Sequence, residues 1–337
     1  MWLEMGVWKC NDTTVLPKTH RQSEHGLIEK KNGSMVAEFI LLGLSEDHNM
    51  NIFLFLLFLL IYMVTIIGNV SLIAVCVCEP RLHTPMYFFL GNLSFIDICY
   101  SAVIAPNLLH QLIISKRMSF SRCAAQMYTY LLLGCTECVL LAIMAYDRYI
   151  AIVFPLRYTI IISRTVFVQL AIFCWLCGSI MALLDTVFTL QLPLCDNDVI
   201  DHFFCESTTF VKMACADSYV AEMVMFCVAV FVLLILSLVI LISYSCIVVA
   251  IIGIRSSEGR YKAFSTCASH LIVVTVIYGT AISMHMKPVS KSSGNQEKIV
   301  SVLYIAMPPM LNPMIYSLRN KDVKAALKKF MWRHFHH

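Results

Sequence analysis

Residues 52–78 read IFLFLLFLLIYMVTIIGNVSLIAVCVC, and Asn69 is the main polar interruption of this apolar run. A membrane-spanning helix needs about 20 consecutive apolar residues. The run is longer than that and is apolar on every side, which does not fit the one-sided pattern of a helix on a soluble core. The stretch therefore predicts a helix that crosses a lipid bilayer.

Six more segments meet the same length criterion. They cover residues 85–107, 123–149, 166–190, 220–252, 264–286 and 297–317. We therefore predict an all-α membrane protein whose core is a bundle of seven transmembrane helices. Three parts follow along the chain, namely an N-terminal segment (1–51), the membrane domain (52–317) and a C-terminal tail (318–337).

The composition agrees with a membrane protein. Of the 337 residues, 59% are hydrophobic and 14% are charged, whereas soluble domains carry about 25% charged residues. The net charge of +4 is modest and does not indicate a nucleic-acid surface. Outside the apolar segments the sequence shows no nucleophile–base pair and no catalytic metal cluster, so it argues against an enzyme.

Lysine and arginine predict which end of each helix faces the cytoplasm. They are more frequent in the loops and tail on the side of Arg157 and Lys262 than in the opposite loops. Cytoplasmic loops are enriched in these residues, so we expect an extracellular N-terminus and a cytoplasmic C-terminus. The glycosylation sequons at Asn11 and Asn32, both in the N-terminal segment, agree with this orientation.

The tail contains a second kind of helix. Val323, Leu327, Phe330 and Met331 recur at helical spacing, with lysines between them. This pattern predicts a short basic amphipathic helix that lies on the cytoplasmic leaflet and contacts membrane lipids.

One face of the third apolar segment carries two charged residues, Glu137 and Arg148. The residues of this face recur at intervals of three and four, and residues so spaced lie on one side of a helix. This face should point into the bundle, and it ends at the pair Asp147-Arg148 where the segment leaves the membrane. Charged side chains in such places usually serve a function, and this position suits a latch that a cytoplasmic partner opens. The face consists of Tyr130, Gly134, Glu137, Leu141, Met144 and Arg148.

Four longer motifs occur in a fixed order. They are LHTPMYFFL (82–90), MAYDRYIAI (144–152), KAFSTCASH (262–270) and PMLNPMIYSLRN (309–320). Over roughly Phe39 to Leu327 the chain resembles the olfactory (odorant) receptors of the rhodopsin-like G-protein-coupled receptor family. One departure is Val153-Phe154, where that family usually has Cys-His.

The resemblance implies a receptor that binds small, mostly apolar volatile ligands in a transmembrane pocket. It further implies coupling to the stimulatory olfactory G protein, a rise in cyclic AMP, and a place in the plasma membrane of olfactory sensory neuron cilia. A rhodopsin-like receptor for a non-odorant small molecule outside the olfactory epithelium is the alternative. A transporter or channel is a third hypothesis, but no inverted repeat supports it.

The same resemblance implies two groups of site residues. The ligand pocket would be lined by Tyr130, Leu131, Gly134, Cys135, Val228, Val232, Tyr278, Ala281, Ile282, His285, Val302 and Ile305. The switch and the G-protein contact would involve Asp147, Arg148, Tyr149, Tyr244, His270, Asn312, Pro313 and Tyr316.

Cysteines and acids give two further expectations. Cys123, Cys195, Cys205 and Cys215 lie at or beyond the rim of the apolar segments, and four cysteines allow three pairings. The resemblance implies the pairs Cys123–Cys205 and Cys195–Cys215.

Asp97 and Glu137 are both mid-membrane acids, which must share either a proton or a cation. The resemblance suggests an allosteric sodium ion, while one protonated acid is the other reading; no other cofactor is expected.

Overall fold

The computed structural model describes residues 38–194, 198–215, 217–254, 256–285, 294–319 and 321–335. The predicted glycosylation sites Asn11 and Asn32, and also Cys195, lie outside the described residues.

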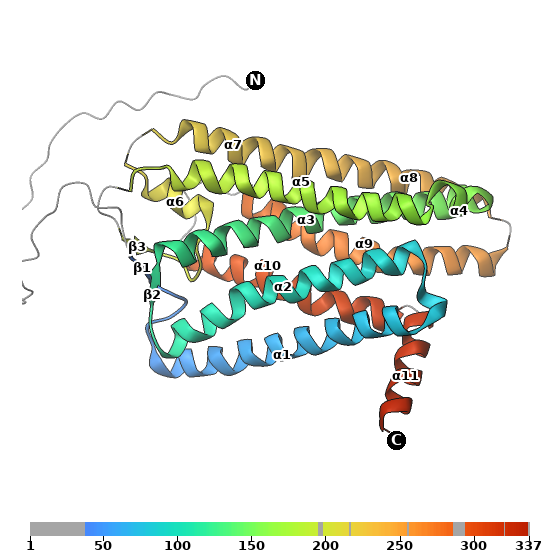
Figure 1. Cartoon of the computed structure of the whole chain (residues 1–337), viewed down its shortest axis with the longest axis horizontal. Coiled ribbons are helices and arrows are strands. Elements are labelled where there is room, and N and C mark those ends of the chain that lie inside the picture. The colour runs from blue at the N-terminus through green and yellow to red at the C-terminus, as the bar shows by residue number, and fades with distance from the viewer. Residues whose placement is uncertain are drawn as a thin grey trace, which may run out of the picture. The chain divides into compact units, whose positions relative to one another are not determined.

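Seven helical rods make up most of the described part of the chain (Figure 1). In the described part of the chain, six are long and apolar enough to cross a membrane, and α9 carries a shorter apolar stretch, Cys267–Ile282. The predicted seven-helix bundle is therefore confirmed. The rods are α1 (His48–Cys78), α2 (Pro85–Ile113), α3 (Phe120–Val153), α5 (Arg164–Leu190), the continuous α7–η3–α8 (Tyr219–Gly253), α9 (Ser257–His285) and α10 (Gly294–Arg319).

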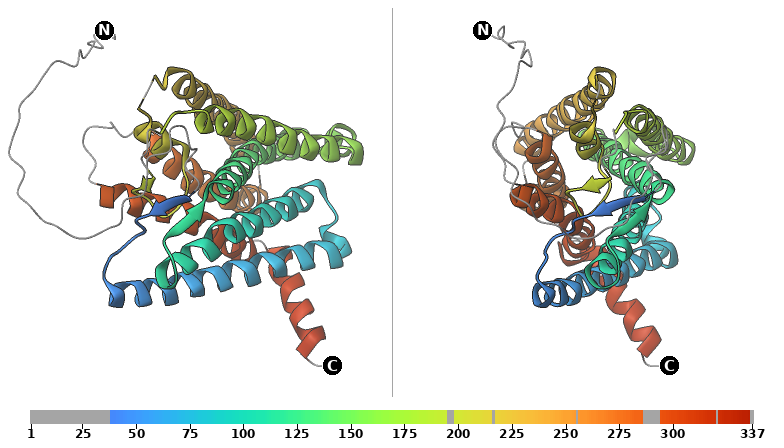
Figure 2. Two further views of the ribbon diagram at one scale, coloured as in Figure 1. Left: turned by 60° about the vertical axis from the view of Figure 1, so that its left-hand side comes forward. Right: turned by 90° about the vertical axis from the view of Figure 1, so that its left-hand side faces the viewer.

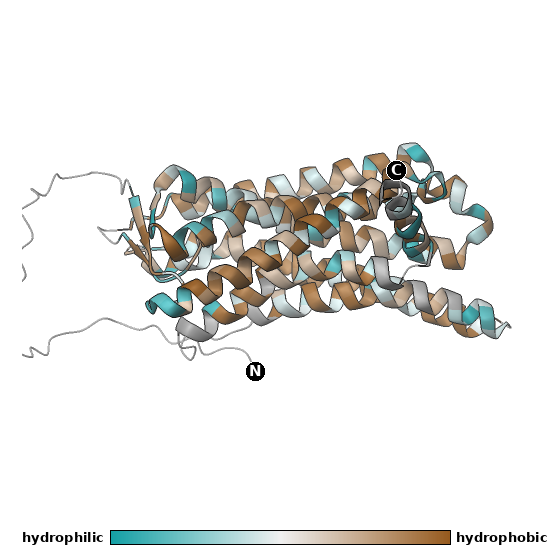
Figure 3. Cartoon of the chain, turned by 90° about the horizontal axis from the view of Figure 1, so that it is seen from below, coloured by the Kyte–Doolittle hydropathy of each residue, from teal (hydrophilic) through white to brown (hydrophobic). Residues whose placement is uncertain are grey.

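α3 lies at the centre of the bundle and α1 lies at its edge. Within the apolar window of each helix, 67% of residues are buried in α3 but only 17% in α1. Apolar residues, drawn in brown, occur along most of the length of the rods (Figure 3). The outer helices face the lipid with apolar side chains and enclose α3. Polar groups that a function requires can therefore lie on α3, away from the lipid.

The fifth rod has a local change of helical pitch. α7 (Tyr219–Ala229) and α8 (Leu236–Gly253) are joined without a break by the π-helical turn η3 (Val230–Ile235). Val232, Leu236, Ile240 and Tyr244 are buried at intervals of four residues. In a regular helix of 3.6 residues per turn, side chains four residues apart are displaced progressively around the helix axis. The wider turn η3 rotates less per residue and offsets part of this displacement.

A small sheet covers one end of the bundle. β1 (Glu38–Leu41) lies between β2 (Arg117–Ser119), to which it is antiparallel, and β3 (Val199–Ile200), to which it is parallel (Figure 2). Phe39 and Leu41 of β1 are fully buried. The sequence had predicted no strand, because each of these strands has at most four residues and pairs with a distant segment.

The short helices fill the connections between rods. At the end that carries the sheet, α6 (Ser207–Met213) follows β3, and at the other end η1 (Pro80–Leu82), η2 (Pro155–Arg157) and α4 (Tyr158–Ile161) link successive rods. The predicted amphipathic helix is present as α11 (Lys321–Phe335), which leaves the bundle beside α1 (Figure 1). Val323 and Ala326 are buried, while Lys329 Nζ lies 2.8 Å from Glu79 Oε2.

α3 and α5 approach each other closely at Gly178, a contact that only a small residue permits. A Cβ atom added at Gly178 would overlap Thr136 Oγ1, and it would lie 2.9 Å from the backbone nitrogen of Thr136. We expect Gly178→Ala to destabilise the receptor by about 1–3 kcal/mol, as other overpacked cores are. The measurement is the melting temperature of the detergent-purified receptor, together with its surface level in cells.

Gly91→Ala is the matched control for this substitution. Gly91 also lies within a membrane helix, α2, but an added Cβ meets no atom within 4 Å. The two variants therefore differ in crowding and not in the kind of substitution. Equal melting temperatures for both would show that the α3–α5 contact is not as tight as the structure indicates.

Candidate functional site

A pocket opens between α3, α5, α6, η3, α7 and α9 near the end of the bundle that carries the sheet. Its empty space is about 750 Å³, the open mouth included. Its lining comes from residues far apart in the sequence. The lining residues are Tyr130, Leu131, Gly134, Cys135, Cys138, Asp185, Glu206, Ser207, Thr208, Met225, Val228, Ala229, Val232, Leu233 and Ala281.

Seven of the residues predicted to bind ligand lie together in this lining. Four come from α3, where spacing by three and four places them on one face. The other three come from the fifth rod and from α9. The seven are Tyr130, Leu131, Gly134, Cys135, Val228, Val232 and Ala281.

Other predicted pocket residues lie elsewhere. Ile282 is 41% exposed on the outside of α9, whereas its neighbour Ala281 is buried, because a helix turns by about 100° per residue. Tyr278 is buried and donates a 3.2 Å hydrogen bond from its hydroxyl to the Cys138 carbonyl oxygen. Val302 and Ile305 line a separate apolar space. The side chain of His285 lies outside the described residues.

Sequence reasoning missed the polar part of the lining. Asp185 on α5, Glu206 before α6, and Ser207 and Thr208 at the start of α6 all line the pocket. Asp185 did carry a signal, because an ionisable residue within an apolar segment is by default a candidate functional residue. The other three lie in a connection whose folding the sequence does not predict.

The connection between α5 and α7 is held over the pocket by covalent and polar contacts. The predicted disulfide between Cys123, on α3, and Cys205 is present. The backbone nitrogen of Cys205 donates to Gln126 Oε1 at 3.2 Å, and the ring of Phe204 lies 5.1 Å from that of Tyr130. Cys215 is also disulfide-bonded, while its predicted partner Cys195 is outside the described residues.

Below the pocket, two acids and an amide meet inside the bundle. Asn312 on α10 donates from Nδ2 to both carboxylate oxygens of Asp97 on α2, at 3.1 and 3.2 Å. Glu137 on α3 is 7% exposed, and its Oε1 atom is buried with no hydrogen-bond partner among the described residues. The structure thus supplies oxygen atoms that fit either a shared proton or a small cation.

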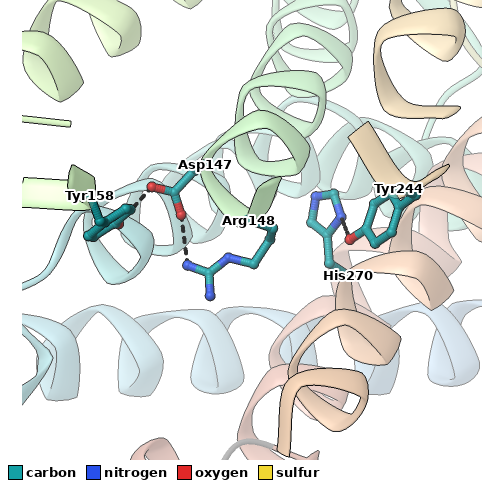
Figure 4. Close-up of polar contacts among 5 residues, drawn as sticks. All are labelled: Asp147, Arg148, Tyr158, Tyr244 and His270. Carbon is teal, nitrogen blue, oxygen red and sulfur yellow. Dashed lines mark hydrogen bonds and ion pairs between the residues drawn. The ribbon is translucent and has the colours of Figure 1, made fainter. Parts of the chain in front are cut away.

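At the opposite end of α3, Arg148 forms the predicted ion pair. Arg148 Nη2 lies 2.7 Å from Asp147 Oδ2, and both side chains are largely buried. The hydroxyl of Tyr158 donates to Asp147 Oδ1 at 2.8 Å, so Asp147 is held from two sides (Figure 4). Burial, and then the nearby Asp147 carboxylate, raises the pKa of the Tyr158 hydroxyl, which therefore remains a donor at physiological pH.

A second pair lies across from Arg148. The hydroxyl of Tyr244 on α8 and Nδ1 of His270 on α9 are 2.7 Å apart, and Arg148 lies between this pair and Asp147 (Figure 4). Tyr316 on α10 is buried nearby, and its hydroxyl has no hydrogen-bond partner in the described structure.

The remaining predicted switch residues lie close to these groups. Tyr149 packs edge-on against Phe154, with ring centroids 5.9 Å apart. Pro313 packs close to Gly68 on α1, where a Cβ would lie 3.1 Å from Pro313 Cγ. The predicted switch residues thus lie on α3, α8, α9 and α10.

A seven-helix bundle with a pocket at one end and a buried ion pair at the other defines the class of membrane receptors. Comparison with known proteins narrows the class. A family model described as "Olfactory receptor" matches residues 58–334. The chain is 49% identical to Olfactory receptor 13D1 of Homo sapiens, over 92% of this chain and 90% of that protein. It is 48% identical to Olfactory receptor 2K2 of Homo sapiens, over 90% of this chain and 96% of that protein.

Olfactory receptor 5AR1 of Mus musculus is 45% identical over 90% of this chain and 98% of that protein. With a family model and several relatives that cover most of its length, this chain belongs to the olfactory receptor family. It is therefore an odorant receptor by family and a multi-pass membrane protein of the plasma membrane.

Proposed function

We propose that this receptor binds small volatile molecules in the pocket between α3, α5, α7 and α9, and that it signals through the stimulatory olfactory G protein to raise cyclic AMP. One observation carries the proposal. A single central helix, α3, lines the pocket with Tyr130 and Gly134 and carries the ion pair Asp147–Arg148 at its other end.

The pocket suits ligands with a substantial apolar part. Leu131, Val228, Val232 and Leu233 supply aliphatic walls, and Gly134 and Ala281 leave space between them. Burial of apolar surface contributes about 25 cal/mol per Å², so small odorants bind with modest affinity and broad selectivity.

Signalling follows as a population shift between two arrangements of the bundle. A ligand favours the active arrangement only to the extent that it binds that arrangement more tightly. In the active arrangement α9 moves outward and Arg148 leaves Asp147 to contact the G protein. Tyr244 and Tyr316, which line the same region, would then assist Arg148.

The chain is oriented with its N-terminus outside and α11 in the cytoplasm, and the receptor resides in the cilia of olfactory sensory neurons. The distribution of lysine and arginine supports this orientation. The Cys123–Cys205 disulfide supports it too, because disulfides persist in oxidising compartments such as the extracellular space.

A cyclic AMP reporter assay against a chemically diverse panel of volatile compounds tests the proposal. Cells that express the receptor together with the olfactory G protein should respond to several apolar compounds, and mock-transfected cells to none. A receptor that reaches the surface and yet leaves cyclic AMP unchanged for every compound would contradict the proposed function.

Glu137→Gln tests whether the buried acids hold a sodium ion. Such an ion, held by Asp97 and Glu137, would favour the resting arrangement. We therefore expect basal cyclic AMP in wild-type cells to rise by at least about fivefold when sodium is replaced by a large organic cation, since coupling energies between sites are about 1–3 kcal/mol. Glu137→Gln should remove this sodium dependence. If basal cyclic AMP does not depend on sodium in the wild-type receptor, and Glu137→Gln gives the same basal level, the two acids share a proton instead.

A further inference from the structure

The pocket has one polar wall, formed by Asp185, Glu206, Ser207 and Thr208. These four residues are contributed by α5 and by the loop and helix that follow β3. The rest of the lining is mainly apolar, so a ligand in this pocket meets carboxylates and hydroxyls as well as aliphatic side chains.

Asp185 is the most buried acid of this wall, with 5% of its surface exposed. The hydroxyl of Thr189, one turn further along α5, donates to Asp185 Oδ1 at 3.2 Å. Asp185 also belongs to the lining of the pocket. A carboxylate at membrane depth is costly and usually faces a cavity or a cationic partner.

Glu206 and Ser207 are positioned by the disulfide next to them. Cys205 is tied to α3, so the two residues that follow it are fixed at the pocket. Glu206 Oε2 lies 3.8 Å from Nε2 of His202. Ser207 is 5% exposed, and its hydroxyl has no hydrogen-bond partner in the part of the chain that the structure describes. A buried hydroxyl left without a partner is destabilising, and a ligand in the pocket can supply that partner.

We propose that the pocket selects ligands with a basic nitrogen on an apolar body, such as aliphatic amines of six to eight carbons. This inference rests on the proposed function and names its ligand class. The ammonium group donates hydrogen bonds to Asp185 and Ser207, and Glu206 adds to the negative potential around it. The alkyl chain lies against Val228, Val232 and the other aliphatic side chains.

Other ligand classes gain less from the same wall. An amine such as the lysine side chain has a pKa of about 10.4, so an alkylamine is cationic at neutral pH and pairs with a carboxylate. Hydrogen bonds between charged groups are roughly twice as strong as neutral ones, which leaves an alcohol with the weaker form. A carboxylic acid of the same length would place a third negative charge beside two others and should be excluded.

The test compares n-hexylamine, 1-hexanol and hexanoic acid in the cyclic AMP assay. We expect hexylamine to act at a concentration at least about tenfold lower than hexanol, with hexanoic acid inactive, because charged hydrogen bonds contribute more. Asp185→Asn removes the charge and keeps the shape. It should raise the effective concentration of hexylamine by about tenfold or more and leave that of hexanol within about threefold.

Three further variants keep the result interpretable. Asp185→Glu retains the charge and should restore much of the amine response if Asp185→Asn loses it. Ser207→Ala should weaken the hexylamine response by a smaller factor. Asp198→Asn is the matched control, because Asp198 is an exposed acid of the same loop that does not line the pocket, so its removal should change neither response. Surface labelling of each variant shows whether it has folded.

The outcomes of this test distinguish a failure of the amine selectivity from a failure of the proposed odorant-receptor function. If the receptor responds to alcohols, ketones or esters but not to amines, or if Asp185→Asn shifts hexylamine and hexanol equally, the amine selectivity is overturned and the odorant-receptor function stands. If a receptor at the surface responds to no volatile compound of any class, the proposed function fails, and this inference fails with it.

Discussion

Arg148→Ala is expected to abolish ligand-driven cyclic AMP production while leaving most of the receptor at the cell surface. Arg148 is held 2.7 Å from Asp147 at the end of α3, beside the Tyr244–His270 pair. The substitution removes the group that we expect to contact the G protein. It also leaves Asp147 with its hydrogen bond from Tyr158, so the buried carboxylate retains one partner and the fold survives.

The measurement is a concentration–response curve in the cyclic AMP assay, normalised to surface level. We expect the maximal response to fall by at least about tenfold, since loss of a charged partner at a buried contact costs about 2–5 kcal/mol. Preserved signalling would contradict the role of Arg148 as the G-protein contact.

Two variants of the same cluster should behave differently from Arg148→Ala. Asp147→Asn weakens the ion pair from the other side and releases Arg148, so basal cyclic AMP should rise instead of fall. Arg148→Lys keeps the charge but loses the planar fork of the guanidinium, and it should give an intermediate response. If all three variants reduced signalling together with surface level, the ion pair would be structural only.

Cys123→Ser and Cys205→Ser should each remove most of the receptor from the cell surface. The bond joins positions 82 residues apart, and the loss of a native disulfide costs about 2–5 kcal/mol. It also frees the loop that carries Glu206 and Ser207 over the pocket. Flow cytometry of non-permeabilised cells with an extracellular epitope measures the surface level.

Non-additivity and a control make this prediction specific. Because either single substitution already breaks the bond, the double variant should be no worse than the singles. Cys246→Ser is the matched control, since Cys246 is a free cysteine on an exposed face of α8. A surface level for Cys123→Ser equal to that of Cys246→Ser would show that the disulfide is dispensable for folding.

The membrane helices could be predicted from the sequence because their signal is local. A long apolar run such as residues 52–78 has no other stable arrangement than a helix in lipid. The ends of the helices were less predictable. α2 continues to Ile113 and α3 begins at Phe120, beyond the apolar segments, because backbone hydrogen bonding continues into residues that no longer contact lipid.

Features that depend on distant contacts could not be predicted in this way. The pairing of Ile40 and Leu41 with Val199 and Ile200 joins segments about half the chain apart. Among the pocket residues, the α3 set was predictable because helical spacing fixes which side chains share a face. On α9 the family resemblance implied both Ala281 and Ile282, but which face turns inward depends on how the helix is rotated in the bundle, so Ala281 lines the pocket and Ile282 is exposed.

The wide turn η3 has a consequence for variation in chain length. A π-helical turn takes up one more residue than an α-helical turn for about the same rotation, so deleting a single residue between 230 and 235 would restore regular winding while α7 and α8 keep their inward faces. A deletion in α8 ahead of Tyr244 has no wide turn to absorb it and would rotate the following residues by about 100°, so that Tyr244 would face away from His270. The rod therefore tolerates the loss of a residue within η3 far better than a loss further along it.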